Sequence, residues 1–297
     1  MVDHSAPIIG ARVVPSLGRG SRLPSLRVLG PGAIFVALSA IAASAIYPVI
    51  FILVTALRSD EDYGRSSIGL PRAVTLDNFK DAWNRANLST YAINSVIVVT
   101  VAVVLLTTVA ALAGFAFAQL RVPFGRSLLG SMVALMIVPP SVLMIPIFKL
   151  VSDLELLNKY TGLVLVYASL NLPFSVYLMT TYMRGIPFEI VDAARVDGAS
   201  KFRTFISIAL PLSRPGLATL ATLNFLVLWN ELLFALLLLQ TDDKRTVMVG
   251  LSILTGQYLT SVPVIAAGLL FSMIPPLLIF ALFQRDLVRG LTAGAVK

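Results

Sequence analysis

Long stretches of apolar residues, separated by shorter polar segments, dominate the sequence. Five stretches contain no Asp, Glu, Lys or Arg, namely residues 28–57, 86–120, 127–148, 160–183 and 246–284. A sixth stretch, residues 215–241, contains one charged residue, Glu231. A helix rises about 1.5 Å per residue, so about 20 apolar residues cross a bilayer core of about 30 Å, and each stretch is long enough to do so. The pattern predicts an all-α polytopic membrane protein with six transmembrane helices.

Within these stretches we place the transmembrane helices at residues 32–57, 92–120, 127–148, 160–183, 216–239 and 262–283. The third contains Pro139, Pro140 and Pro146, and proline removes backbone hydrogen bonds and breaks or kinks a helix. Irregular backbone at membrane depth is tolerated only against protein or a water-filled cavity. This segment is therefore either one wall of a cavity or a bend that only serves packing.

Charged residues are scarce and unevenly distributed. They make up 13% of the chain, against 57% hydrophobic residues, and the mean hydropathy is +0.89. Lys and Arg are concentrated in the two terminal segments and in the segments after the second and fourth helices. Because cytoplasmic segments of membrane proteins are enriched in Lys and Arg, both termini are expected in the cytoplasm. The same enrichment explains the net charge of +8 without nucleic acid as a partner.

This topology divides the chain into successive parts. The first apolar stretch is too long for the hydrophobic region of a secretory signal, so we expect it to remain as a membrane helix. The expected parts are a cytoplasmic N-terminal tail, 1–30; a first transmembrane helix, 31–57; a transmembrane core, 90–285, with a cytoplasmic loop at 184–214; and a cytoplasmic C-terminal tail, 286–297.

Residue types that carry most enzyme chemistry are missing. The chain has no cysteine, and its one histidine, His4, lies in the N-terminal tail, which excludes disulfides and disfavours a metal centre. No GxxxxGK[ST] phosphate-binding loop occurs, so the chain is not itself an ATPase. No catalytic, cofactor-binding or metal-binding residues are predicted.

The most informative segment is the polar loop between the fourth and fifth predicted helices. Pro187 suits the first position of a short helix, and Asp197-Gly198 supplies a stop, because glycine adopts left-handed geometry freely. A second short helix, 200–208, would run into Leu210-Pro211. Two such helices form a knob that either packs against another protein or lies among lipid headgroups.

The loop resembles the EAA motif of ABC-importer permeases, which has Glu-Ala-Ala, three residues, Gly, and later Ile-x-Leu-Pro. The matching residues are Asp192, Ala193, Ala194, Gly198, Ile208, Leu210 and Pro211. Asp192 departs from the family's Glu and shortens the side chain by one methylene. The segments 93–98, 138–148, 228–234 and 283–297 are similar to the carbohydrate-uptake branch of that family, the maltose-transporter type.

The resemblance implies a type I ABC-importer permease bundle that moves a sugar or a similar solute by alternating access. It implies three kinds of partner. A second permease subunit would form a heterodimer with this chain, two copies of an ABC ATPase would bind on the cytoplasmic side, and a solute-binding protein would act on the outer side. ATP and Mg²⁺ would be used by the ATPase, and this chain would bind no cofactor. The residues expected to couple the chain to the ATPase are Glu189, Asp192, Ala193, Ala194, Asp197, Gly198, Ala199, Leu210 and Pro211.

Glu231 is the only ionisable residue in a predicted transmembrane helix, and such residues usually face a cavity or a partner. Asn224 precedes it by two helical turns, on nearly the same face. The candidates for a translocation cavity are Asn171, Tyr177, Asn224, Trp229, Asn230 and Glu231. The alternative is that Glu231 only forms a hydrogen bond that holds its helix to a neighbour.

Other functions predict features that the sequence largely lacks. An ion-coupled secondary transporter needs buried charged relays in several helices, and a membrane-embedded enzyme needs paired carboxylates, His or Cys. A non-transporting scaffold and a permease for a glycerol-phosphate-type solute stay open.

Overall fold

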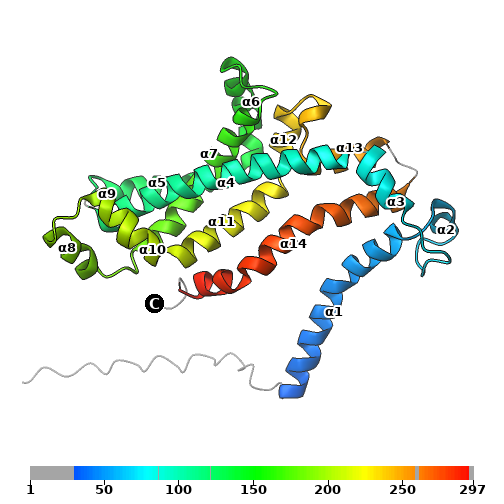
Figure 1. Cartoon of the computed structure of the whole chain (residues 1–297), viewed down its shortest axis with the longest axis horizontal. Helices are drawn as coiled ribbons and strands as arrows, with labels where there is room; N and C mark the ends of the chain where they lie inside the picture. The colour runs from blue at the N-terminus through cyan, green and yellow to red at the C-terminus, as the bar shows by residue number, and fades with distance from the viewer. Residues whose placement is uncertain (1–29, 86, 121, 258–260, 294–297) are drawn as a thin grey trace, which may run out of the picture. The chain divides into compact units, whose positions relative to one another are not determined.

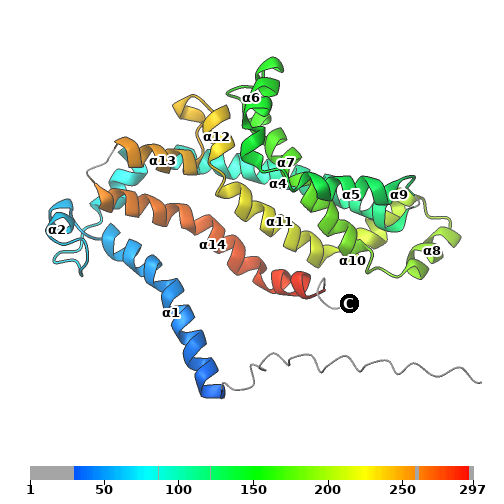
Figure 2. The ribbon, with the colours of Figure 1, turned by 180° about the vertical axis from the view of Figure 1, so that it is seen from behind.

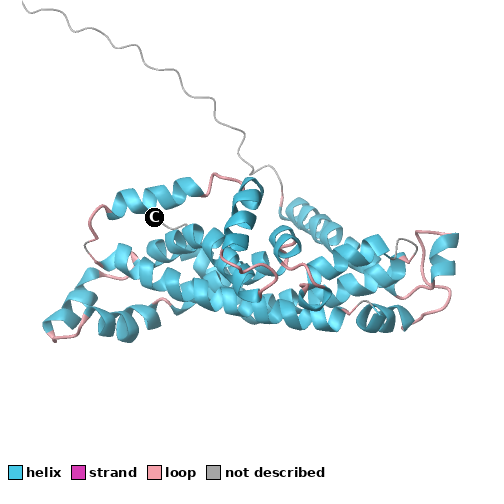
Figure 3. Ribbon diagram, turned by 90° about the horizontal axis from the view of Figure 1, so that it is seen from above, coloured by secondary structure: helices cyan, strands magenta, loops and turns pink. Residues whose placement is uncertain are grey.

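The computed structural model describes residues 30–85, 87–120, 122–257 and 261–293, and all regular elements within these ranges are helical (Figures 1 and 3). Within these ranges, four helices are long and apolar enough to cross a membrane, or up to six if each of two bent helix pairs is one crossing. The predicted all-α polytopic membrane protein is confirmed, and the count of six depends on the bent pairs. Residues 1–29 of the predicted N-terminal tail and 294–297 of the predicted C-terminal tail lie outside the described residues.

The first long helix, α1 (Pro31–Ala56), passes from one compact unit into another. The first unit ends at Val49 and the second begins at Ile50. The stretch Gly32–Ala56 has a mean hydropathy of 2.3 in its most apolar part, so it is suited to cross a membrane. It matches the first predicted transmembrane helix.

The frame of the second unit consists of α4 (Leu88–Gln119), α7 (Tyr160–Met183), α11 (Arg214–Trp229) and α14 (Val262–Ala293). Figures 1 and 2 show α4 beside α7, and α11 between α4 and α14. α4 and α7 approach each other closely at Gly114, where an added Cβ would lie 2.7 Å from the Cβ of Met179. Only a residue without a side chain allows the two backbones to approach this closely.

Two hydrophobic clusters form the core of this unit. One lies around the first half of α4 and includes α12 (Leu233–Leu238) and α13 (Val247–Gln257). The other joins the end of α4 to the end of α7 and to α8 (Phe188–Val196). The loop predicted from sequence is therefore anchored in the second cluster.

The third predicted transmembrane helix, 127–148, is broken. Its first part is α5 (Gly125–Leu135), followed by η3 (Pro140–Leu143) and α6 (Met144–Asp153), and the two parts meet at 90°. Pro139 has extended backbone and Pro140 begins η3, as expected for residues that cannot continue a helix. The break predicted from the prolines is confirmed.

The fifth predicted transmembrane helix, 216–239, is wrong as one continuous helix. α11 ends at Trp229, and α12 begins at Leu233 after a short non-helical segment. The bent pair long enough to cross a membrane is instead Lys201–Leu212 with Arg214–Trp229, at 76°. At this interruption the Glu231 carboxylate accepts hydrogen bonds from the Phe234 and Ala235 N–H groups at the start of α12.

The second short helix predicted in the loop, 200–208, is also longer than expected. α9 (Lys201–Thr204) continues through the π-helical turn η4 (Phe205–Ala209) into α10 (Leu210–Leu212). Pro211 does not stop it, and it lies just after the π-helical turn η4, one residue before the segment ends at Leu212. The sixth predicted helix likewise continues past residue 283 to Ala293, with Pro275 and Pro276 inside it.

The polar segment after α1 contains α2 (Asp60–Arg65), α3 (Asp77–Lys80) and the π-helical turn η2 (Asp81–Arg85). Arg58 is 2% exposed, and its Nε donates to Asp62 at 3.0 Å, so this buried cation is paired. This hydrogen bond from Arg58 holds the pKa of Asp62 below its ordinary value. The Asn78 amide donates to the carbonyls of Ala56 and Arg58, which satisfies backbone groups at the end of α1.

Candidate functional site

The α8 helix presents one side to the bundle and the other to the outside. Val191 and Ala194 are buried, whereas Glu189, Asp192 and Ala193 are exposed. Pro187 is the residue before the helix rather than its first residue. Of the two alanines expected to couple the chain to the ATPase, only Ala193 is exposed, so only Ala193 is available to a partner.

A tight corner follows α8 at Gly198. This residue has a φ of +78°, which confirms the left-handed geometry expected there. The Gly198 N–H donates to the Arg195 carbonyl at 3.0 Å, and the Ala199 N–H donates to the Ala194 carbonyl at 2.9 Å. These two bonds form a Schellman motif, which satisfies carbonyls that a helix end leaves free. The position of the glycine is therefore fixed by the backbone of the corner.

The next residue starts the second helical segment of the loop. The Ser200 hydroxyl accepts a hydrogen bond from the Arg203 N–H at 3.2 Å and so caps α9. Asp197, exposed at the end of α8, and Ala199 complete the corner. The helices α8 and α9 thus meet at a turn in which the Schellman motif caps the end of α8 and Ser200 caps the start of α9.

Large apolar side chains on the loop face outward. Val196 is 87% exposed and Phe202 64% exposed, and Phe188 and Ile190 are exposed as well. Farther along, Pro211 is exposed and Leu210 is half-buried. A cluster of exposed apolar side chains on a polar loop marks a surface that contacts another protein or lipid.

Three of the predicted cavity residues belong to a ladder of hydrogen bonds between α7 and its neighbours. The Tyr167 hydroxyl donates to Glu231 at 2.8 Å, and the Asn171 amide donates to the Tyr167 carbonyl. The Ser175 hydroxyl donates to the Asn171 carbonyl and accepts from the Asn224 amide at 3.1 Å. Tyr167, Asn171 and Ser175 recur every fourth residue, so they occupy one face of α7. Tyr167 and Ser175 were not among the predicted site residues, although this spacing is visible in the sequence.

Glu231 lies in the break between α11 and α12 rather than on a helix. Its Oε1 accepts from the Phe234 N–H at 2.9 Å, and its Oε2 accepts from the Ala235 N–H at 3.1 Å and from the Tyr167 hydroxyl. The expectation that Asn224 and Glu231 share one helical face is wrong, because α11 ends before Glu231. The Glu231 carboxylate therefore caps the start of α12 and holds α12 to α7.

The remaining predicted cavity residues, Tyr177, Trp229 and Asn230, take no part in this ladder. Trp229 is buried, and its indole N–H donates to the Ser272 carbonyl of α14 at 3.0 Å. Asn230 is exposed and donates to the Leu226 carbonyl of its own helix. Tyr177 is 44% exposed. Of the six predicted cavity residues, the ladder therefore includes three, Asn171, Asn224 and Glu231.

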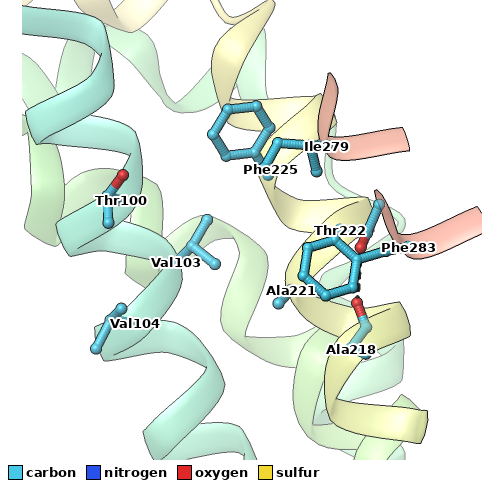
Figure 4. A pocket seen from close by; sticks show the side chains of 9 residues that line it. All are labelled: Thr100, Val103, Val104, Ala218, Ala221, Thr222, Phe225, Ile279 and Phe283. Atoms are coloured by element: carbon cyan, nitrogen blue, oxygen red, sulfur yellow. Dashed lines mark hydrogen bonds between the residues drawn. The ribbon is translucent and has the colours of Figure 1, made fainter. Parts of the chain in front are cut away.

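A pocket of about 190 Å³ lies between α4, α11 and α14 (Figure 4). Two threonines supply the only polar side chains of its lining, and the Thr222 hydroxyl donates to the Ala218 carbonyl. Sugar hydroxyls find few partners in such a space. None of the six predicted cavity residues is among the lining residues, which are Thr100, Val103, Val104, Ala218, Ala221, Thr222, Phe225, Ile279 and Phe283.

A polar cluster surrounds Asp242 in η5 (Asp242–Lys244), at the start of α4. Asp242 accepts hydrogen bonds from the Tyr91 hydroxyl at 2.8 Å, the Asn87 amide at 3.3 Å and Arg245 at 2.6 Å. The Tyr91 bond is the main cause that holds the pKa of Asp242 below its ordinary value. On the other side, the Asn158 side chain accepts from the Gln240 and Thr241 N–H groups. The segment between α12 and α13 is thus tied to both α4 and the turn before α7.

Among the described residues, no group of three or more His, Cys, Asp or Glu side chains is arranged to hold a metal ion. The geometry instead shows a membrane bundle with a capped, outward-facing loop at one end of α4 and a polar cluster at the other.

Comparison with known proteins identifies the class. A family model described as the inner membrane component of binding-protein-dependent transport systems matches residues 107–292. The chain belongs to this family. It is a multi-pass permease subunit of the cytoplasmic membrane, and ATP hydrolysis is the task of a separate subunit. Members of the family act together with another permease, an ATPase and a solute-binding protein.

Individual relatives cover almost the whole chain. A putative ABC transporter permease protein, ORF2 of a Caldicellulosiruptor species, is 35% identical over 84% of this chain and 91% of its own length. The melibiose/raffinose/stachyose import permease protein MelC of Bacillus subtilis is 30% identical over 94% of this chain and 99% of its own length.

A solved structure shares the fold. It is the crystal structure of a bacterial ABC transporter involved in the import of the acidic polysaccharide alginate. A chain of that structure is similar with a TM-score of 0.76 and 24% identity, over 91% of this chain and 99% of that one.

Proposed function

We propose that this chain carries a sugar or a sugar-like solute across the cytoplasmic membrane, with both termini and the loop 184–214 in the cytoplasm. The excess of Lys and Arg in these segments supports the orientation. The Bacillus subtilis relative, an import permease for melibiose, raffinose and stachyose, supports a carbohydrate.

The observation that carries the mechanism is the corner of α8, Gly198 and α9, with its exposed apolar side chains. Residues 187–208 seat in a groove of the ATPase, and two ATPase copies bind this chain and a second permease in a heterodimer. ATP and Mg²⁺ act at the ATPase. When the ATPase dimer closes, it moves the loop and the helices attached to it as rigid bodies, which alternates access to the solute between the two sides of the membrane.

In this mechanism Glu231 serves the architecture of the bundle, because all three of its hydrogen bonds go to protein groups that fix α12 and α7. The solute would contact other groups of this chain, the partner permease, or both. Glu231→Gln separates the alternatives. Loss of assembly supports the architectural role, whereas normal assembly and ATP hydrolysis without uptake would support contact with the solute.

The first test is to purify the tagged chain from its own membranes in mild detergent. We expect a second permease and an ABC ATPase to be recovered with it, and we expect the solute-binding protein loaded with sugar to stimulate ATP hydrolysis. A chain purified without an ATPase would contradict the proposal. Uptake of a glycerol phosphate ester and of no oligosaccharide would contradict only its carbohydrate part.

A charged residue on the outward face of the loop gives a sharper test. Val196→Asp places a carboxylate where an apolar contact is proposed, so the recovery of the ATPase should fall at least about tenfold, as expected for a buried unpaired charge. Leu70→Asp is the matched control, because Leu70 is 81% exposed on the segment after α1, away from the loop. Equal recovery with both variants would show that the ATPase does not bind this surface.

A further inference from the structure

One buried amide, the side chain of Gln119, joins the end of α4 to the end of α7 and to the connector that follows it. Gln119 is the last residue of α4 and is only 3% exposed. Its Nε2 donates to the Met183 carbonyl at 2.7 Å and to the Ile186 carbonyl at 3.1 Å. A buried amide with both hydrogens used in this way is strongly held, because loss of either bond leaves a buried polar group unpaired.

The two carbonyls lie at the end of α7 and within the connector that follows it. Met183 is the last residue of α7, and Ile186 belongs to the short connector that leads to α8. One amide therefore bridges the connector and fixes its angle to α7. Without this bridge, α8 could rotate about residues 184–187 without moving the helix behind it.

A second contact joins the last turn of α8 directly to the end of α4. Arg195, in the last turn, donates to the Gln119 carbonyl at 3.2 Å and to the Asp192 carboxylate at 2.9 Å. The carboxylate of Asp192 orients the guanidinium toward the end of α4. Asp192 stands where the EAA motif has Glu, so here the acidic side chain serves a contact within the loop.

We infer that Gln119 and Arg195 are positioning residues that make α4, α7 and α8 move as one body when the loop is displaced. The inference rests on the proposed function, in which the ATPase displaces α8. Arg195 joins α8 to α4, and Gln119 joins α4 to the connector between α7 and α8. Close packing of α4 on α7 at Gly114 then carries the motion along the bundle.

The test uses the complete transporter, with its partner permease and ATPase, and needs no knowledge of the solute. Hydrogen exchange is measured without nucleotide and with ATP, Mg²⁺ and vanadate, and ATP hydrolysis is measured in parallel. In the wild type, exchange should change in α8 and also in the last turns of α4 and α7. In Arg195→Met the change in α8 should remain, whereas the change at the ends of α4 and α7 should fall about tenfold, the factor expected for one hydrogen bond to a charged group.

Conservative variants and matched controls separate positioning from simple stability. Arg195→Lys keeps the charge and reaches one of the two acceptors, so it should restore part of the response. Gln119→Leu should speed exchange in the connector even without nucleotide and weaken the response of α4. Arg126→Met, at an exposed arginine of α5, and Gln284→Leu, at an exposed glutamine of α14, should behave as the wild type.

Each remaining outcome counts against a defined statement. A wild-type complex without any response in α8 would overturn the proposed function and the inference with it. A wild-type response that Arg195→Met and Gln119→Leu leave intact would overturn only the inference. If both Arg195→Met and Arg195→Lys lose ATPase binding, Arg195 is needed to assemble the transporter. The inference that it positions the helices would then be wrong.

Discussion

Substitution of Gly198 isolates the contribution of one backbone angle to coupling. The residue has a φ of +78°, and an added Cβ would meet no atom within 4 Å. Steric crowding therefore does not add to the free-energy cost of Gly198→Ala. That cost arises because alanine has to adopt the left-handed backbone conformation. That conformation costs a residue with a side chain about 1–2 kcal/mol, so the fraction of molecules with a formed corner falls about 5–30-fold relative to the unformed state.

A small series of variants makes this argument quantitative. Gly198→Val should be worse than Gly198→Ala, because β-branched residues tolerate left-handed geometry least. Gly198→Asn should restore most of the function, because asparagine adopts this geometry more readily than other residues with side chains. Gly130→Ala in α5 is the matched control, because its Cβ also meets no atom within 4 Å, and no positive φ strains it. That variant should be neutral or slightly stabilising.

The assay compares solute uptake with ATP hydrolysis in proteoliposomes that contain the whole transporter. Gly198→Ala and Gly198→Val should insert into the membrane normally and lose uptake per ATP hydrolysed, in the order given. If Gly198→Val transports as the wild type does, the corner does not couple the subunits. If Gly198→Asn is as defective as Gly198→Ala, the left-handed angle is not the reason that glycine is needed.

Two further predictions concern the polar clusters. Tyr167→Phe removes the hydroxyl that donates to Glu231, so we expect a loss of about 1.5–3 kcal/mol, read as a lower midpoint of thermal unfolding in detergent. The effect should largely disappear in a Glu231→Gln background, and fully additive effects would show that the two residues do not interact. For Asp242, the folded pKa lies below the ordinary value of 3.8, so its stabilisation is complete above that value and is lost as the pH falls through the folded pKa. Unfolding midpoints measured between pH 6 and about pH 3 should therefore fall more for the wild type than for Asp242→Asn, and parallel curves would contradict this assignment.

The sequence predicted those features that depend on neighbouring residues. The corner at Gly198 was predictable because both of its hydrogen bonds join residues within five positions of one another. The break in the third helix was predictable because prolines act on their own backbone. The long apolar stretches of α1, α4 and α7 also agree closely with the predicted membrane helices.

The features that the sequence did not predict depend on distant partners. The stretch 215–241 is apolar enough for one helix, and at its break stands a carboxylate that pairs with Tyr167 in another helix. Gln119 looks like a single polar residue at the end of an apolar stretch, and its partners at Met183 and Ile186 come together with it only in the folded bundle. Asn224 and Glu231 seemed to share a face only because a continuous helix was assumed. No local pattern contains this information.

The hydrogen bond between Tyr167 and Glu231 also has a consequence for how the protein is made. α12 has six residues, about 9 Å of helix, so it cannot cross a membrane by itself. The acceptor follows its donor by 64 residues, so α7 has already left the ribosome when Glu231 is synthesised. The order of synthesis therefore supplies Tyr167 before Glu231, so the acidic side chain does not have to enter the lipid without its hydrogen-bond partner.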